Sequence, residues 1–316
     1  MKQRKKRFLT VLLLFVVCIG TSTILSYRNI KGILDESYEN DNRIVASVIC
    51  NGIENSFLRP IMVAETMSKD SILKEIVKHD TQKEAIETEE YASEYLESIR
   101  DGFGYSIVFA VSDLSKAYFT SNGISKFVNP GEDYHDEWYK LFLESGKVYD
   151  LDVDTEEAAN WSLSVFVNSE VRDEENNLIG VCGVGVDMTE LQRLLEKYER
   201  IYNVKVDIID NTGLIQVDTQ AERIERDYIK INNLEDYSDG ELYYEVSDDK
   251  KLVICYMEDL DWYLVVQYEK DINTNVINVI KPGVICLALG IIVFVLYSIY
   301  EYKIYPDEEN KIDEDN

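Results

Sequence analysis

Two uninterrupted apolar runs lie near opposite ends of the chain. The first, residues 8–27, contains no charged residue, and the second, residues 284–300, follows Pro282. A helix of about 20 apolar residues is long enough to cross the hydrocarbon core of a bilayer. We therefore expect transmembrane helices at 8–27 and 280–300. Pro282 suits a first helical turn, or the second helix begins earlier, from about Val276, and bends at Pro282.

The charges beside the first run predict the topology. Lys and Arg crowd residues 1–7, and the positive-inside rule places such a flank in the cytoplasm. A cleaved secretory signal also begins with a basic segment, but residues 8–27 lack a clear small-residue cleavage site, which favours an uncleaved anchor. We expect a multi-pass protein of the cell membrane, with both termini cytoplasmic and residues 28–275 extracytoplasmic. The acidic tail, residues 301–316, has no hydrophobic periodicity and is predicted to be disordered.

A long amphipathic stalk helix is predicted over residues 28–79. Its apolar residues recur mostly three and four positions apart, which is the helical period: Ile30, Ile33, Leu34, Val45, Val48, Ile49, Ile53 and Phe57. Such a face packs either against the chain's own domain or against a second copy in a homodimer. Pro60 predicts a break in this helix, because the residue before a proline disfavours the helical conformation.

The pattern changes from Tyr105 onwards to short runs of Val, Ile, Phe and Tyr separated by turn residues, which is typical of strands. Strands are expected within 105–123, 161–171 and 178–188, and a helix is expected at 189–202. The same order recurs in reduced form afterwards, with Asp210 placed as Asp113 is in the first half. We therefore predict an α+β fold of two stacked modules, at about 80–188 and about 203–270, joined by the helix at 189–202.

Charge and cysteine content narrow the function. A net charge of −28 excludes a nucleic-acid partner, because phosphate binding needs clustered Lys and Arg. The five cysteines show no CxxC spacing, and two lie in the apolar runs, so we expect neither a disulfide framework nor a zinc site. Cys182 and Cys255 lie in strand-like runs, where we expect buried free thiols.

Catalytic motifs are missing from the sequence. It contains two histidines and none of the serine-elbow, P-loop, Rossmann or HExxH patterns. Accidental pairs of carboxylates are certain among 60 Asp and Glu residues, so such pairs carry no signal. We expect no enzyme, no catalytic residue and no cofactor.

Four stretches resemble the double Cache family of bacterial sensor domains: DEWYKLFLESGKVYDLDVD at 136–154, WSLSVFVNSEV at 161–171, LIGVCGVGVDMTEL at 178–191 and IIDNTGLI at 208–215. The resemblance implies a stalk helix and two PAS-like antiparallel-sheet modules, the distal one binding a ligand. In that family such domains feed a cytoplasmic signalling module. No such module is recognised in this sequence, so the chain is either a naturally short member that acts through a separate cytoplasmic partner or a fragment of a longer protein.

The resemblance also implies where a ligand would bind. In the subgroup of the family that reads amino acids, an Arg two residues before a Trp-Tyr pair, an upstream Tyr and a distant Asp hold the ligand. Trp138 and Tyr139 match the pair, and Asp187 matches the distant Asp. Asp136 stands at the Arg position and Gly131 at the upstream Tyr position. An acidic residue there repels a carboxylate, whereas Asp187 and the aromatic rings suit a cation such as an amine.

Further residues complete the candidate ligand site. Asp152 and Asp154 lie on one side of a strand-like segment together with Asp150, and Tyr118, Asn168 and Trp161 are candidate lining residues. Alternating carboxylates also suit calcium, but a solvated strand edge is the simpler interpretation, and we expect no metal. Trp138 and Tyr139 have core packing as an alternative role. Asp187 has an alternative as the N-cap of the following helix.

The sequence thus predicts a membrane-anchored extracytoplasmic sensor of a small molecule, acting as an input domain for signalling. Two alternatives stay open. One is a tethered ligand-binding module without signalling, and the other is a structural membrane protein with a vestigial pocket.

Overall fold

The computed structural model describes residues 2–156, 162–237, 242–247, 250–269 and 273–304. The chain divides into two compact units. One spans Asn42–Glu269 and holds both sheets. The other combines the segments Met1–Asp41 and Lys270–Asn316. Most of the predicted tail, residues 305–316, lies outside the described residues.

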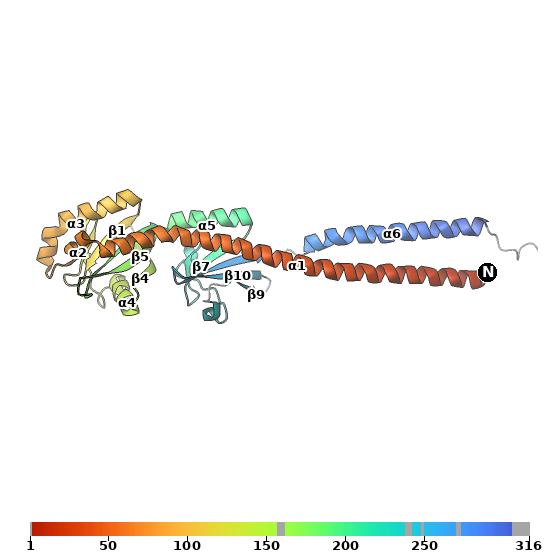
Figure 1. Ribbon diagram of the computed structural model, residues 1–316, viewed down its shortest axis with the longest axis horizontal. Helices are drawn as coiled ribbons and strands as arrows, with labels where there is room; N and C mark the ends of the chain where they lie inside the picture. Colours follow the sequence, from red (N-terminus) through yellow and green to blue (C-terminus); the bar gives the residue numbers. More distant parts are fainter. Residues whose placement is uncertain (1, 157–161, 238–241, 248–249, 270–272, 305–316) are drawn as a thin grey trace, which may run out of the picture. The chain divides into compact units, whose positions relative to one another are not determined.

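In its described residues, the second unit consists of helices. It contains the first part of α1 (Lys2–Lys69) and α6 (Asn273–Ile304), which lie side by side in Figure 1. The rings of Phe15 and Phe294 stack at 6.0 Å between centroids, and a Cβ on Gly290 would lie 3.1 Å from the ring of Phe15. Among the described residues, α1 from Leu13 onwards is the one helix long and apolar enough to cross a membrane. The apolar stretch of α6, Gly283–Tyr297, is shorter than a typical span.

The distal sheet has six antiparallel strands in the order β3-β2-β1-β6-β5-β4. Its strands are β1 (Ile107–Ser112), β2 (Ala117–Thr120), β3 (Gly123–Phe127), β4 (Tyr149–Glu156), β5 (Ser162–Arg172) and β6 (Leu178–Asp187). One face packs against α1 and the helices α2 (Ser71–Val77) and α3 (Gln82–Phe103). The other face packs against α4 (Glu137–Ser145), which follows the short helix η1 (Tyr134–Asp136). Figure 1 shows α3 and α4 on opposite sides of these strands.

The proximal sheet has five antiparallel strands in the order β8-β7-β11-β10-β9. They are β7 (Lys205–Ile209), β8 (Ile215–Val217), β9 (Leu242–Ser247), β10 (Lys250–Met257) and β11 (Trp262–Glu269). Two short helices, η3 (Ala221–Arg223) and η4 (Leu234–Tyr237), lie in the connection after β8. Helix α5 (Met188–Tyr202) joins the two sheets, and its buried Leu191 and Leu195 share one core with α1 and both sheets. The predicted α+β class, the long N-terminal helix and the two antiparallel sheets are therefore present.

The stalk helix differs from its prediction at Pro60. The expected break is absent, because α1 continues through Pro60 to Lys69. The helix ends at Lys69, and the next residue, Asp70, directly precedes α2. The side chain of Asp70 accepts a hydrogen bond from the backbone N–H of Ile72 at 2.7 Å and caps α2. A capping carboxylate satisfies free backbone donors at a helix start, so the cap of α2 and not the proline sets the boundary.

The cysteine prediction is wrong for two residues. Cys50 of α1 and Cys255 of β10 form a disulfide across 205 residues of sequence, with Cα atoms 6.6 Å apart. The sequence gives no sign of this pair, because the two cysteines are far apart in the chain and come together only when the helix packs on the strand. Cys182 is a buried free thiol as expected, and Cys18 and Cys286 are also free.

Candidate ligand site in the distal module

Strand alternation places three carboxylates on the face of the distal sheet that meets α4. Leu151 and Val153 of β4 point into the core with α1, so Asp152 and Asp154 between and after them point the other way. The ladder sets Asp152 opposite Phe166 and Asp150 opposite Asn168 of β5. The three aspartates were predicted to lie on one side of this strand, and that side is the face of the sheet that α4 covers.

A cavity of about 20 Å³ opens between this face and α4. It is lined by residues of β1, β2, α4, β4 and β5: Phe109, Tyr118, Trp138, Asp152, Asp154, Thr155, Phe166 and Asn168. A water molecule needs roughly 10–15 Å³ by the same measure. The cavity therefore holds about one water-sized group as it stands, and a larger ligand requires α4 or β4 to move outward.

Aromatic rings form the apolar wall of the cavity. Phe109 and Tyr118 stack at 5.1 Å, and the ring of Trp138 meets that of Phe109 edge-on at 5.7 Å. Two glycines of β6 make room for side chains of β1. A Cβ on Gly183 would lie 2.6 Å from the ring of Phe109, and one on Gly185 would lie 2.5 Å from Ile107.

The polar wall of the cavity is acidic. Burial, followed by the charges of Asp154 and Glu225, raises the pKa of Asp152 to about 7. Burial also raises the pKa of Asp154, although the N–H of Thr155 and the charges of His135 and Lys126 oppose that shift. No Lys or Arg is among the described residues that line the cavity. Carboxylates in this position are stabilised by any cation that enters.

Asn168 supplies an unsatisfied acceptor to the same cavity. Its side chain is 2% exposed, and its Oδ1 receives no hydrogen bond from any residue that the structure describes. A buried amide oxygen without a donor costs about 1–3 kcal/mol. An N–H donor placed in the cavity would remove that cost.

Asp136, at the position where the amino-acid-reading relatives carry Arg, does not line the cavity. It is 1% exposed and pairs with Lys126 at 2.6 Å, while its other oxygen accepts a hydrogen bond from the N–H of Asn129 at 2.7 Å. The charge of Asp136 is therefore balanced by Lys126, and its carboxylate is bonded to the backbone of the loop before α4. The structure therefore offers no guanidinium for a ligand carboxylate at this position.

Two of the predicted residues lie outside the cavity wall. The hydroxyl of Tyr139 donates to Asp113 at 2.8 Å, and burial, followed by the Asp113 charge, raises the tyrosine pKa. Asp187 accepts a hydrogen bond from the N–H of Thr189 at 2.7 Å and caps α5, which is its alternative role. Trp161 lies outside the described residues. Tyr118, Trp138, Asp152, Asp154 and Asn168 do come together at the cavity, joined by Phe109, Thr155 and Phe166, which sequence reasoning missed.

The acidic stretch of β4 does not form a metal centre in the described part of the chain. No three His, Cys, Asp or Glu side chains there are arranged to hold an ion. Asp150 instead forms an ion pair with Lys147 at 3.0 Å.

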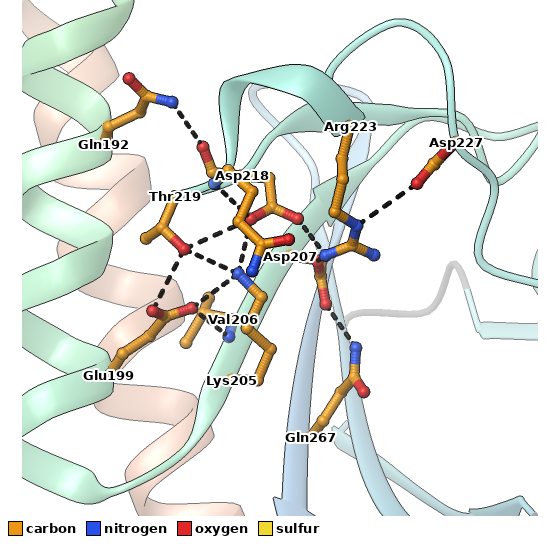
Figure 2. A network of polar contacts seen from close by, with 11 residues as sticks. Gln192, Glu199, Lys205, Val206, Asp207, Asp218, Thr219, Arg223, Asp227 and Gln267 are labelled. Atoms are coloured by element: carbon orange, nitrogen blue, oxygen red, sulfur yellow. Dashed lines mark hydrogen bonds and ion pairs between the residues drawn. The ribbon is translucent and has the colours of Figure 1, made fainter.

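A second charged cluster lies in the proximal module and is drawn in Figure 2. Asp207 and Asp218 are fully buried, and Arg223 of η3 pairs with both of them. Lys205 pairs with Asp218 at 2.5 Å and with Glu199 of α5 at 3.0 Å. Burial and the neighbouring Asp218 raise the pKa of Asp207 to about 6.

Each charge of this cluster has a partner of opposite sign, and the amide of Gln267 also donates to Asp207. The cluster ties α5 to β7, to the end of β8 and to η3. We therefore assign it a structural role, since its carboxylates are satisfied within the chain, in contrast to those of the distal cavity.

Comparison with known proteins agrees with this architecture. A family model of the double Cache type, described as Cache domain, matches residues 29–275. Among solved structures, the ligand-binding domain of the Pseudomonas fluorescens chemoreceptor CtaA in complex with L-isoleucine is 14% identical. It covers 76% of this chain and 96% of its own, with a TM-score of 0.51.

Two more structures show the same fold. The ligand-binding domain of the Pseudomonas aeruginosa amino acid chemoreceptor PctC in complex with GABA is 13% identical. It covers 73% of this chain and 100% of its own, with a TM-score of 0.51. The extracellular domain of the putative histidine kinase mmHK1S-Z2 is 14% identical, covers 74% and 97%, and has a TM-score of 0.56. With the family model matching most of its length, the chain belongs to the double Cache family of sensor domains.

Proposed function

We propose that this protein is a membrane-anchored extracytoplasmic sensor whose distal cavity binds a small ligand through an ammonium group. The observation that carries the proposal is the buried, unsatisfied Oδ1 of Asn168 beside the two carboxylates of β4. An ammonium has three N–H donors and no acceptor. It therefore matches the amide oxygen and two carboxylates of this wall, with one donor for each.

The aromatic wall favours the same ligand. The face of a Trp ring attracts cations through its quadrupole, by about 0.5–2 kcal/mol depending on exposure, and Trp138 borders the cavity. A ligand carboxylate would find no cation among the described lining residues. The relatives named above bind L-isoleucine and GABA, which carry both groups. We infer that the amine-binding half of such a site is kept here and the carboxylate-binding half is lost.

The small size of the cavity supports a sensing role over simple capture. A ligand larger than water must displace α4 or β4, so binding selects a conformation with a wider cavity. The residues just before the β4 aspartates contact the proximal module. Lys147 pairs with Asp261 at 2.8 Å, and the hydroxyl of Tyr149 donates to the carbonyl of Asp259 at 2.9 Å. Movement of β4 therefore reaches the turn between β10 and β11 directly.

From the proximal module, the signal would pass through α1 and α6 to a separate cytoplasmic signalling partner. In this proposal α6 is the second transmembrane helix, and both chain ends are cytoplasmic. The basic residues before the first apolar run support that orientation.

A thermal-shift panel on the full chain in detergent tests the ligand class. The probes are ethylamine and putrescine, the zwitterions L-isoleucine and GABA, and the anions acetate and succinate. A ligand at a hundredfold excess over its Kd stabilises the folded state by about 2.7 kcal/mol. We expect stabilisation by an amine, its loss in Asp152→Asn, and its retention in the control Glu174→Gln, an exposed carboxylate in the turn before β6. Stabilisation by anions alone would contradict the proposal.

A further inference from the structure

The charged cluster of Figure 2 fastens α5 to the proximal sheet. Its members are Glu199, Lys205, Asp207, Asp218 and Arg223. From α5, the amide of Gln192 donates to the carbonyl of Asp218 at 2.9 Å. The carboxylate of Glu199 accepts a hydrogen bond from the backbone N–H of Val206 at 3.0 Å. Because α5 begins directly after β6 and ends just before β7, a change within the cluster acts on the helix that joins the two sheets.

The cluster contains more negative charges than positive ones. Asp207 and Asp218 are fully buried, and the side chain of Glu199 is 18% exposed. Lys205 pairs with Glu199 and Asp218. Arg223 pairs with Asp207 and Asp218. Within the described part of the chain, two cations thus serve three carboxylates. When all three carboxylates are ionised, one buried negative charge is left without compensation, which is costly in a protein interior.

One proton removes this excess charge, and the contacts indicate Asp207 as its site. Asp218 pairs with both cations, whereas Asp207 shares Arg223 with it. Burial, followed by the neighbouring Asp218, raises the pKa of Asp207 to about 6. Against the effect of burial, hydrogen bonds from Asp207 and Lys205 lower the pKa of Asp218. A protonated carboxyl group has an O–H donor, so a neutral Asp207 donates a hydrogen bond to the ionised Asp218.

We propose that Asp207 is a proton-binding site, and that its protonation in a mildly acidic medium strengthens the attachment of α5 to the proximal sheet. In the protonated cluster, the two remaining carboxylates match the two cations. In the ionised cluster, Asp207 and Asp218 repel each other and compete for the guanidinium of Arg223. The side chains of Lys205 and Arg223 are 28% and 23% exposed, so the cluster borders the solvent from which it takes the proton.

Two further side chains border the cluster without supplying the missing positive charge. Gln267 of β11 donates its amide to Asp207 and is neutral at any pH. Asp227 lies 3.6 Å from Arg223, but its side chain is 58% exposed, so solvent and salt screen its charge. Asp227 therefore provides a control, because its substitution changes the charge at the rim of the cluster and leaves Asp207 in place.

Denaturant unfolding of the full chain in detergent at pH 5 and pH 7.5 tests the proton site. All proteins carry Asp152→Asn, because Asp152 has a pKa of about 7. The pKa of Asp207 is about 6 in the folded chain against 3.8, so its contribution to stability is complete at low pH and is lost as pH rises through 6. That contribution raises the folding equilibrium constant about tenfold from pH 7.5 to pH 5. We expect Asp207→Asn to abolish this increase and Asp227→Asn to keep it. An equal pH dependence with and without Asp207 would overturn the proposal.

Hydrogen exchange followed by mass spectrometry tests the attachment of α5 in the same proteins. Each rate is divided by the intrinsic exchange rate at that pH. Peptides from α5, at 188–202, should then exchange about fivefold more slowly at pH 5 than at pH 7.5, and control peptides from α3, at 82–103, should show no such difference. Asp207→Asn should remove the difference in α5. Corrected α5 rates that are independent of pH while Asp207 is present would refute the coupling of the proton site to this helix. Neither test uses an amine, so their outcome is independent of the distal cavity.

Discussion

The Cys50–Cys255 disulfide offers a test of how α1 is held on the proximal module. The perturbation is Cys50→Ser together with Cys255→Ser. Both residues are buried, with 3% and 7% exposure, so the change removes the covalent link with little change in volume. Closing a loop of 205 residues restricts the unfolded chain by about 5 kcal/mol in the chain-entropy model. Unfolding free energies of single domains are about 5–15 kcal/mol, so this loss is large.

The assay is denaturant unfolding of the full chain in detergent, followed by tryptophan fluorescence. Trp262 lies edge-on to Phe57 of α1, with ring centroids 6.3 Å apart, and so reports on the contact between the stalk and the proximal sheet. Wild-type protein in reductant should unfold at the denaturant concentration that unfolds the double variant. Reductant should not affect the variant itself.

Cys182→Ala is the matched control, because it removes a buried sulfur that forms no disulfide. It should cost about 1 kcal/mol, as a small buried deletion does, and leave the reductant effect in place. Equal unfolding of the double variant and the oxidised wild-type protein would refute the reasoning. So would a wild-type protein whose unfolding does not respond to reductant.

Three further predictions concern buried polar groups. Asp152 has a pKa raised to about 7 from 3.8, so its contribution to stability is complete at low pH and is lost as pH rises through 7. Asp152→Asn should therefore raise the melting temperature more at pH 8 than at pH 5, and an equal change at the two pH values would contradict this reasoning. Asn168→Leu removes an acceptor without a donor and should leave stability unchanged or raise it by about 1 kcal/mol, while amine binding is lost in the same thermal-shift assay. Arg223→Met leaves the buried Asp207 without its ion-pair partner and should cost about 3 kcal/mol in denaturant unfolding. Adding Asp207→Asn should recover part of that loss, and no recovery would contradict the assignment of the cluster.

Local patterns in the sequence predicted the fold class well. The period of three and four residues along the stalk and the alternation of the strands are set by the backbone geometry of each element. The break expected at Pro60 did not occur, because α1 continues past the proline and Asp70 caps the next helix. Pairing of Cys50 with Cys255 depends on tertiary contacts across 205 residues, which no local pattern records.

The candidate site was predicted in part for the same reason. Alternation along β4 put Asp152 and Asp154 on one side without any knowledge of the partner strands. Asn168 reaches the same cavity through the register of β5 against β4. Motif position alone could not separate Trp138, which lines the cavity, from Tyr139, which is directed at Asp113. Successive residues of a helix point in different directions, so the start of α4 decides which ring faces the site.

A calorimetric titration of the full chain with the amine that gives the largest thermal shift tests the central claim most directly. The comparison is between the wild-type protein and Asp152→Asn combined with Asp154→Asn. Hydrogen bonds to charged groups contribute about 1.5–3 kcal/mol each. We therefore predict one binding site in the wild-type protein and at least about a hundredfold weaker binding in the double variant. Equal affinity in both proteins would place the ligand elsewhere and contradict the assignment of the distal cavity as a cation-binding site.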